Sequence, residues 1–136
     1  MSSLEKLVPS APIRSYLLFT LHGEPFATDV LPIREIIDYR PPVPEPRMPV
    51  LDLAHRLGRG RTVVGGRSSV IVMGGWAGEV GILVGDIHEI VEFAAADIEP
   101  APGFDLGLPT GLVAGIGRAR GRTVVILDLH RLAAAV

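Results

Sequence analysis

Two aspartates stand at similar places in the sequence and could do chemistry together. Asp52 and Asp128 each follow an apolar run and precede a leucine. Two carboxylates brought close could form a catalytic pair, one acting as an acid and the other as a base. An aspartate at the start of a short helix can instead accept hydrogen bonds from the backbone N–H groups of the first turn. We favour helix capping, because both aspartates precede short helical patterns, and such a cap stabilises a helix by ~1 kcal/mol.

The four histidines are the next residues with chemical potential, and their spacing does not indicate a metal site. No two of them are four residues apart, as they would be in the HExxH pattern of a zinc helix. The chain has no cysteine, which excludes a thiolate zinc site and a disulfide framework. We therefore expect no metal and no cofactor. The histidines predicted to be solvated or helix-capping are His22, His55, His88 and His130.

Other patterns typical of enzymes are missing from the sequence. Glycine clusters at 58–66 and 74–81 contain no GxxxxGK[ST] loop for phosphate. Ser68 and Ser69 lack the GxSxG elbow of a serine nucleophile. A local basic patch could bind an acidic partner or lipid head groups, or could be a solvated loop; it consists of Arg56, Arg59, Arg61 and Arg67.

The single tryptophan, Trp76, is predicted at the tip of a hairpin. Small residues surround it in the stretch Gly74–Gly78, which is typical of a turn. There the side chain could anchor an interface or fold back over its own hairpin.

Composition bounds the class of protein. A chain of 136 residues suits one domain or two small subdomains with a common core. The net charge of -2 and the pI near 6.1 argue against a general nucleic-acid surface. No apolar run approaches the ~20 residues of a membrane span, and the N-terminus has no apolar signal core, so we expect a cytoplasmic protein without membrane insertion. Sixteen glycines and twelve prolines favour an all-β chain with many turns.

Several elements must position these residues. We expect a flexible N-terminal tail over residues 1–14 and one domain over residues 15–136. A helix is predicted from Asp29 to Asp38, with Ile33, Ile36 and Ile37 on its buried face. A helical turn is also expected after the 50–53 strand, at 94–98 and after the last strand. The predicted strands are residues 15–21, 25–28, 50–53, 68–73, 79–84, 87–93, 112–116 and 123–127.

Two short stretches of the sequence occur twice. Residues 60–64 repeat as 121–125, and residues 51–57 repeat as 127–132 with one alanine fewer. The two stretches do not keep the same order, so this is not a tandem repeat. The repetition indicates either a chemistry common to strand-to-helix exits or a duplicated β-subdomain.

A succession of segments resembles the CheW-like domain family of bacterial chemotaxis. The segments are YLLFTL, EPFATDVLPIREIIDY, PVLDLAHRLG, GILVGDIHEIVEFAAADIEP and GLVAGIGRARGRTVVILDLHRL. The resemblance implies an all-β fold of two small SH3-like β-barrels that share a hydrophobic core. It also implies a non-catalytic adaptor or scaffold in chemosensory signal transduction. Its expected partners are the regulatory domain of a CheA-type histidine kinase and the helical cytoplasmic tip of a chemoreceptor.

The sequence departs from the family at one place. Members carry a segment of the type GVxNLRGxxxP before the PVLDL strand, whereas here a proline-rich stretch, residues 41–49, stands in its position. The first barrel is therefore predicted to be shortened, with an unpaired edge covered by the proline stretch, the N-terminal tail or another chain. One alternative is a degenerate paralogue that binds the kinase or another CheW-like domain but not receptors. A homodimer formed by strand exchange is another.

Nine residues are predicted to bind partner proteins. By matched position, the resemblance implies one contact at Ile33, Arg34, Glu35 and Ile36, with Val43 and Pro44 beside it, and a second contact in a groove at Leu83, Val84 and Ile87. A hypothesis of a different class is a small ligand-binding β-barrel or hydrolase that uses Asp52, Asp128 and a histidine. It requires those groups to meet in a closed polar pocket.

Overall fold

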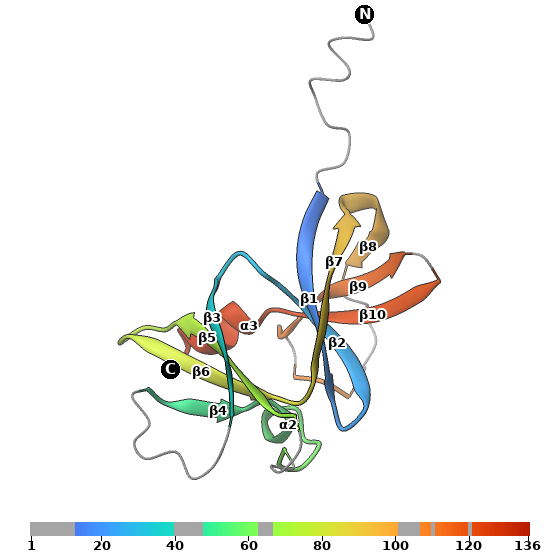
Figure 1. Ribbon diagram of the computed structural model, residues 1–136. Coiled ribbons are helices and arrows are strands. Elements are labelled where there is room, and N and C mark those ends of the chain that lie inside the picture. Colours follow the sequence, from blue (N-terminus) through green and yellow to red (C-terminus); the bar gives the residue numbers. More distant parts are fainter. Residues whose placement is uncertain (1–12, 40–47, 63–66, 101–106, 110, 120) are drawn as a thin grey trace, which may run out of the picture.

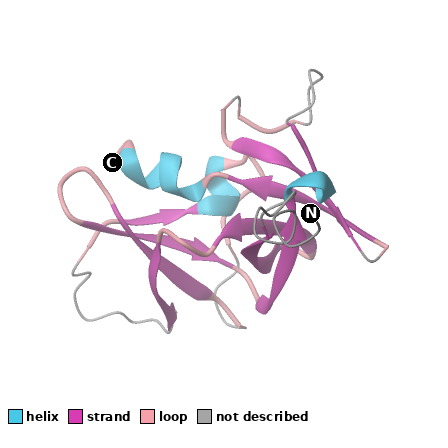
Figure 2. Ribbon diagram, turned by 90° about the horizontal axis from the view of Figure 1, so that it is seen from above, coloured by secondary structure: helices cyan, strands magenta, loops and turns pink. Residues whose placement is uncertain are grey.

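Strands make up most of the described chain, as the magenta arrows of Figure 2 show. The computed structural model describes residues 13–39, 48–62, 67–100, 107–109, 111–119 and 121–136. The strands are β1 (Ile13–Leu21), β2 (Glu24–Asp29), β3 (Ile33–Asp38), β4 (Val50–Asp52), β5 (Ser69–Gly74), β6 (Glu79–Val84), β7 (Ile87–Ala94), β8 (Ile98–Pro100), β9 (Val113–Ala119) and β10 (Arg122–Leu127). The short helices are α2 (Leu53–Arg56), the 3-10 helix η1 (Ala95–Asp97) and α3 (Leu129–Ala134). The predicted all-β class is confirmed.

Within the described residues the strands form two hydrogen-bonded sheets, which lie side by side in Figure 1. One has the strand order β3-β5-β6-β4 and the other the order β7-β1-β2-β10-β9-β8. Each sheet packs around a small apolar cluster of its own. We call the four-stranded sheet the first barrel and the six-stranded sheet the second barrel. Helix α2 follows β4, whereas α3 follows β10 and packs against β5 and β6 of the first barrel.

A third and larger apolar cluster joins the two barrels. It contains Phe19 and Phe26 from the second barrel, and Ile71 and Ile82 from the first, all of them at 0% exposure. The rings of Phe19 and Phe26 stack with their centroids 6.2 Å apart. Helices α2 and α3 contribute residues such as Leu53 and Leu129 to the same cluster. The barrels therefore share one hydrophobic core, as predicted.

The two barrels repeat one four-strand unit. The order β3-β5-β6-β4 corresponds to β7-β1-β2-β10, with the first two pairs antiparallel and the last pair parallel in both. The registers agree residue by residue: Ile36 lies opposite Ile71, as Ile90 lies opposite Leu17. A helix with an aspartate N-cap follows β4 and also β10. Of the two explanations for the repeated LDL stretches, the structure supports a duplicated β-subdomain.

The order of the equivalent strands along the chain differs, and this hides the repeat in the sequence. Once the sheets are aligned, residues 33–39 (IREIIDY) match residues 87–93 (IHEIVEF), with every position identical or similar in kind. Even the β-bulge is repeated, since the pairing skips Arg34 in β3 and His88 in β7. The other repeated stretch is not equivalent, because Gly60–Thr62 lie outside any strand while Arg122–Val125 belong to β10.

The predicted helix from Asp29 to Asp38 is wrong. Residues 33–38 form strand β3, which pairs antiparallel with β5. The i, i+3, i+4 spacing of the isoleucines fits a helix, but β-branched side chains favour a strand, and pairing with β5 decides the outcome. Asp29 closes a turn by accepting a hydrogen bond from the Leu31 amide at 2.9 Å. Ile36 is 42% exposed rather than buried.

Other boundaries shift by a few residues. β1 begins at Ile13, so the last two residues of the predicted tail belong to the sheet, and residues 1–12 lie outside the described chain. The helical turn predicted at 94–98 is the 3-10 helix η1, and it leads into the short strand β8, which was not predicted. The proline-rich stretch lies largely outside the described residues, which resume at Met48.

Candidate functional site

Asp52 and Asp128 both cap helices, as predicted. Asp52 Oδ1 accepts the His55 amide at 3.4 Å and the Thr62 hydroxyl at 2.6 Å, and Asp52 Oδ2 accepts the Thr62 amide at 2.8 Å. Asp128 Oδ1 accepts the Arg131 amide at 3.0 Å. Each carboxylate caps its own helix, and Asp52 does not line the cavity beside Asp128, so they do not form the closed catalytic pair that the hydrolase hypothesis requires.

Hydrogen bonding lowers the pKa of Asp52. Burial by itself raises the pKa of this carboxyl, but hydrogen bonds from Thr62 and from the backbone of the first helical turn favour the ionised form and together outweigh burial. The resulting pKa lies below the ordinary value, so the carboxylate stays charged as a cap at neutral pH.

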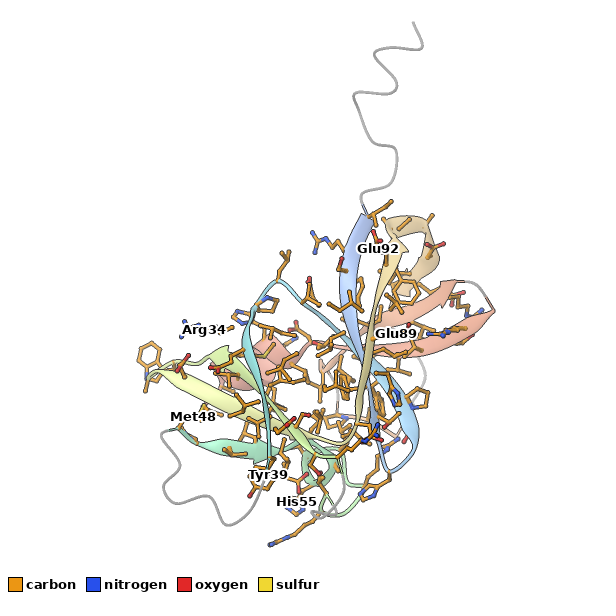
Figure 3. All side chains as sticks on the ribbon, viewed as in Figure 1. Arg34, Tyr39, Met48, His55, Glu89 and Glu92 are labelled. Atoms are coloured by element: carbon orange, nitrogen blue, oxygen red, sulfur yellow. The ribbon has the colours of Figure 1, made fainter. Side chains whose placement is uncertain are left out.

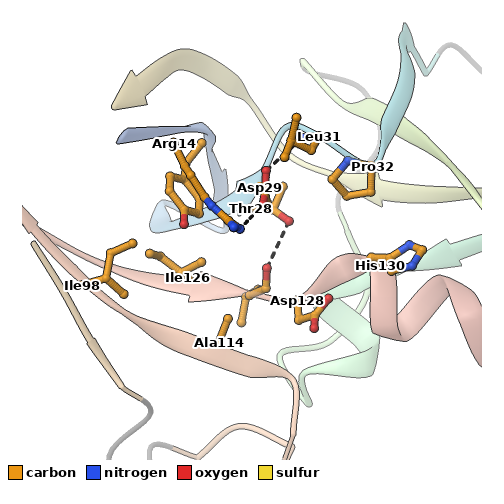
Figure 4. Close-up of a pocket in the computed structure, with 12 residues that line it drawn as sticks. Arg14, Thr28, Asp29, Leu31, Pro32, Ile98, Ala114, Ile126, Asp128 and His130 are labelled. Carbon is orange, nitrogen blue, oxygen red and sulfur yellow. Dashed lines mark hydrogen bonds and ion pairs between the residues drawn. The ribbon is translucent and has the colours of Figure 1, made fainter. Parts of the chain in front are cut away.

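Several of the polar groups that line the cavity beside Asp128 already have partners (Figure 4). Arg14 forms an ion pair with Asp29 at 3.5 Å, and the Thr28 hydroxyl donates to the Leu127 carbonyl at 3.1 Å. Burial raises the pKa of Tyr16, and Asp29 raises it further while Arg14 lowers it. The tyrosine therefore stays protonated at neutral pH.

Two negative findings hold for the described residues. Among them, no group of three or more His, Asp or Glu side chains could hold a metal ion. None of the helices that the structure describes is long and apolar enough to cross a membrane. Exposed histidines are found on the β1–β2 turn, α2, β7 and α3, and His22 adopts a positive φ of 50° in its turn.

The predicted basic patch is divided by the fold. Arg59 turns inward, where its Nε donates to Glu24 Oε2 at 2.8 Å and its guanidinium lies 5.9 Å from the centroid of the Phe26 ring. The hydrogen bond with Glu24 raises the pKa of Arg59. Arg56, Arg61 and Arg67 are exposed.

The first group of predicted partner-binding residues lies on the outer strand β3. Arg34 stands at the bulge, where its guanidinium lies over Gly74 and is 3.6 Å from Glu79 (Figure 3). Glu35 and Ile36 are exposed, and Ile33 is half-buried. This group offers one large apolar side chain, Ile36, beside two charged ones.

The second group is largely buried. Leu83 is 6% exposed and Val84 is 0% exposed, which leaves Ile87 as the member with accessible surface. Val43 and Pro44 lie outside the described residues.

One hollow brings together members of both groups. It has a volume of about 430 Å³ and lies where β3 and β5 of the first barrel meet β7 of the second. Ile36 and Ile87 line it with Tyr39, and Asp38 and Arg67 supply charge. The tertiary structure therefore joins the two separately predicted contacts into one surface between the barrels.

A second exposed surface, on β7, is not among the residues predicted from the sequence. Ile90 is 61% exposed, more than its equivalent Ile36, and stands beside Glu89, which pairs with Arg122 (Figure 3). The matching stretches IREIIDY and IHEIVEF are the signal that could have revealed it. Trp76 is 86% exposed at the tip between β5 and β6, so it does not fold back over its hairpin.

Comparisons with known proteins agree on one family. A model of the CheW-like domain matches residues 15–136. The chain is 25% identical to the chemotaxis protein CheW of Klebsiella aerogenes over 147 aligned residues, covering 97% of this chain and 89% of that protein. It is 23% identical to the chemotaxis protein CheW of Rhizobium meliloti over 131 residues, covering 85% and 84%.

A solved structure shows the same architecture. The crystal structure of the scaffolding protein TtCheW from Thermoanaerobacter tengcongensis superposes with a TM-score of 0.73 at 26% identity, over 89% of this chain and 92% of that one. This match confirms the predicted fold of two SH3-like barrels. The alignment with the Klebsiella protein is longer than the 136 residues of this chain, so that relative contains residues that are absent here.

Proposed function

The chain belongs to the CheW-like domain family, and from this premise we propose that it is a cytoplasmic adaptor that links a CheA-type histidine kinase to chemoreceptors without doing chemistry itself. Its relatives support a role as a chemotaxis adaptor. Two exposed surfaces could bind these partners: the hollow lined by Ile36 and Ile87, and the surface around Ile90.

The hollow between the barrels is the observation that carries the proposal. Ile36, Tyr39 and Ile87 give the hollow apolar surface, while Asp38, Arg67, Ser68 and Ser69 make the larger part of its lining polar. A narrow helical tip with an apolar stripe and charged edges would fit such a hollow, because helices dock through side chains on one face. We assign the hollow to the receptor tip.

The kinase is assigned to the surface around Ile90. Ile90, which is 61% exposed, lies near Glu89 and Glu92 on β7 and offers an apolar centre with a charged rim. A linking protein needs two surfaces that partners can occupy together, and the equivalent residues Ile36 and Ile90 of the duplicated unit lie on strands of different barrels. Contacts of modest area gain strength when many copies act in an array.

Matched substitutions on the two equivalent isoleucines test this assignment. Ile36→Asp should weaken binding of a receptor-tip fragment at least tenfold, or ~1.4 kcal/mol, and leave binding of the kinase regulatory domain within about twofold. Ile90→Asp should do the reverse, because the same change falls on the other surface. Isothermal titration calorimetry measures both affinities, and circular dichroism checks that each variant is folded.

The same titrations distinguish the proposed adaptor from the main alternative, a paralogue without receptor binding. The shorter first barrel favours a paralogue that binds the kinase, or another CheW-like domain, but no receptor. If the wild-type protein binds the kinase domain but not the receptor tip, that alternative is established.

Light scattering tests the remaining alternative, a strand-exchanged homodimer. A monomer at high protein concentration would exclude this homodimer. If Ile36→Asp and Ile90→Asp each weaken binding of both the receptor tip and the kinase domain, the proposal of two separate binding surfaces is contradicted.

A further inference from the structure

The internal repeat identifies what the first barrel lacks. In the second barrel, β10 pairs with β2 on one side and with β9 on the other, and β9 in turn pairs with β8. In the first barrel, the equivalent strand β4 pairs with β6, and its other edge has no strand among the described residues. The open position is therefore beside β4, where the counterpart of β9 would lie.

Chain length argues against a replacement from the connection between β3 and β4. Between Phe93 and Val124 of the second barrel lie residues 94–123, which include β8 and β9. Between their equivalents Tyr39 and Met48 lie only residues 40–47. β9 and its turn alone occupy residues 113–121, more than this connection contains. The connection is too short to form both a strand like β9 and the turn that would return it to β4.

The free edge of β4 carries the hydrogen-bonding groups that a strand needs. The Gly81 amide donates to the Pro49 carbonyl at 2.9 Å, so Pro49 faces β6. Successive residues of a strand face opposite edges, and the N–H and C=O of Val50 therefore face the open side. Its equivalent Ile126 lies opposite Gly115 of β9, and the Asp128 amide beyond it donates to the Leu112 carbonyl at 2.7 Å.

The interior of the first barrel is uncovered at the same place. In the second barrel, Ile126 is 3% exposed and Phe93 is buried, with its ring against Gly117 of β9. The equivalent Val50 is 38% exposed. Tyr39 and Met48, at the end of β3 and just before β4, are only half-buried (Figure 3).

We propose that the free edge of β4 binds an extended strand of a partner protein, antiparallel to β4, with glycine at the position that faces Tyr39. The pattern follows from β9, in which a Cβ added at Gly117 would come within 2.9 Å of the Phe93 ring, the equivalent of Tyr39. A second copy of this chain is a poorer donor, because its own β9 is held between β10 and β8. Addition of a strand to a sheet edge combines main-chain hydrogen bonds with side-chain pockets.

A peptide with the sequence of residues 111–119 is a suitable probe. Titrated into the full-length, isotope-labelled protein, it should bind saturably and shift the amide resonances of Val50 and Asp52, on β4, more than those of β10. Val50→Pro removes the edge N–H and should weaken binding at least tenfold, whereas Val50→Ala keeps that N–H and should weaken it no more than about threefold. A peptide with Gly117→Val should bind at least tenfold more weakly to the unaltered protein.

The peptide variant keeps the test valid if Val50→Pro does not fold. The proposal is overturned if no binding occurs at millimolar peptide, or if the valine peptide binds as well as the original. Slow hydrogen exchange of the Val50 and Asp52 amides in the free monomer would also overturn it, since the chain's own residues would then cover the edge. Protection that appears only at high protein concentration would show that a second copy is the occupant instead.

Discussion

At the scale of single residues, Asp52 links the end of a strand to the start of a helix and to a loop. Its carboxylate accepts hydrogen bonds from the His55 amide and from both the amide and the hydroxyl of Thr62. Asp128 caps α3 in the same way, by accepting a hydrogen bond from the Arg131 amide. Asp52 therefore ties down more of the chain than its equivalent does, and its ionisation should be visible in the stability of the fold.

A pH series with Asp52 variants tests this role. A carboxyl whose pKa is lowered in the folded state stabilises the fold above its unfolded pKa of ~4, and this stabilisation is lost as pH falls through the folded pKa. Asp52→Asn still caps the helix but cannot titrate, so its free energy of unfolding should fall less than that of the wild type below pH ~4. Asp52→Ala should also lose ~1 kcal/mol at pH 7. Urea unfolding across pH 2.5–7 measures both effects, and equal pH dependence in wild type and Asp52→Asn would refute the role.

At the scale of elements, β9 shows how a strand can close a barrel against a large aromatic side chain. Gly117 lies directly over the Phe93 ring, and a Cβ there would be 2.9 Å from two ring atoms and 3.3 Å from Ile126. Phe93 also contacts Tyr16, with their centroids 5.6 Å apart, so the ring has little room to move. The glycine is required by close packing rather than by backbone conformation.

Gly117→Ala should therefore destabilise the protein by ~1–3 kcal/mol through overpacking. Phe93→Leu in the same chain should recover part of this loss, so that the double variant is more stable than the sum of the single effects predicts. Chemical unfolding of the four proteins of the cycle gives the coupling. Strict additivity would show that the ring and the strand do not compete for space.

At the scale of the whole molecule, the common core makes the two barrels depend on each other. Phe19, Leu21 and Phe26 of the second barrel pack in one cluster with Ile71, Met73 and Ile82 of the first, and all of them are almost fully buried. Residues from α2 and α3 complete it. Neither barrel has a comparable cluster of its own. Among the described residues, the small apolar cluster within each sheet contains five buried residues or fewer.

Phe19→Ala should destabilise both barrels together, by ~3–5 kcal/mol. Because the side chain belongs to the common core, unfolding should remain one transition, with amide signals of β5 and β6 lost at the same denaturant concentration as those of β9 and β10. Far-UV circular dichroism measures the loss of stability, and residue-resolved NMR shows whether the amide signals of both barrels disappear together. Separate unfolding transitions for the two barrels would contradict the claim that their stabilities depend on each other.

Much of this architecture is local in origin and could be predicted from the sequence. The hairpin at His22-Gly23, the tip around Trp76 and the aspartate caps of α2 and α3 each depend on a few neighbouring residues with specific backbone preferences. The strand β3 could not be predicted in this way, because the spacing of Ile33, Ile36 and Ile37 suits both a helix and a strand, and only pairing with β5 decides between them.

The relation between the barrels was decided by the tertiary structure. The sequence by itself determined the β class, the turns, the caps and the absence of one segment, because these follow from residue type and chain length. Only the fold revealed that β3 and β7 are equivalent, that Ile36 and Ile87 line one hollow, and that the open edge belongs to β4. These features depend on contacts between residues far apart in the chain, and the permuted strand order leaves the match between IREIIDY and IHEIVEF as their trace in the sequence.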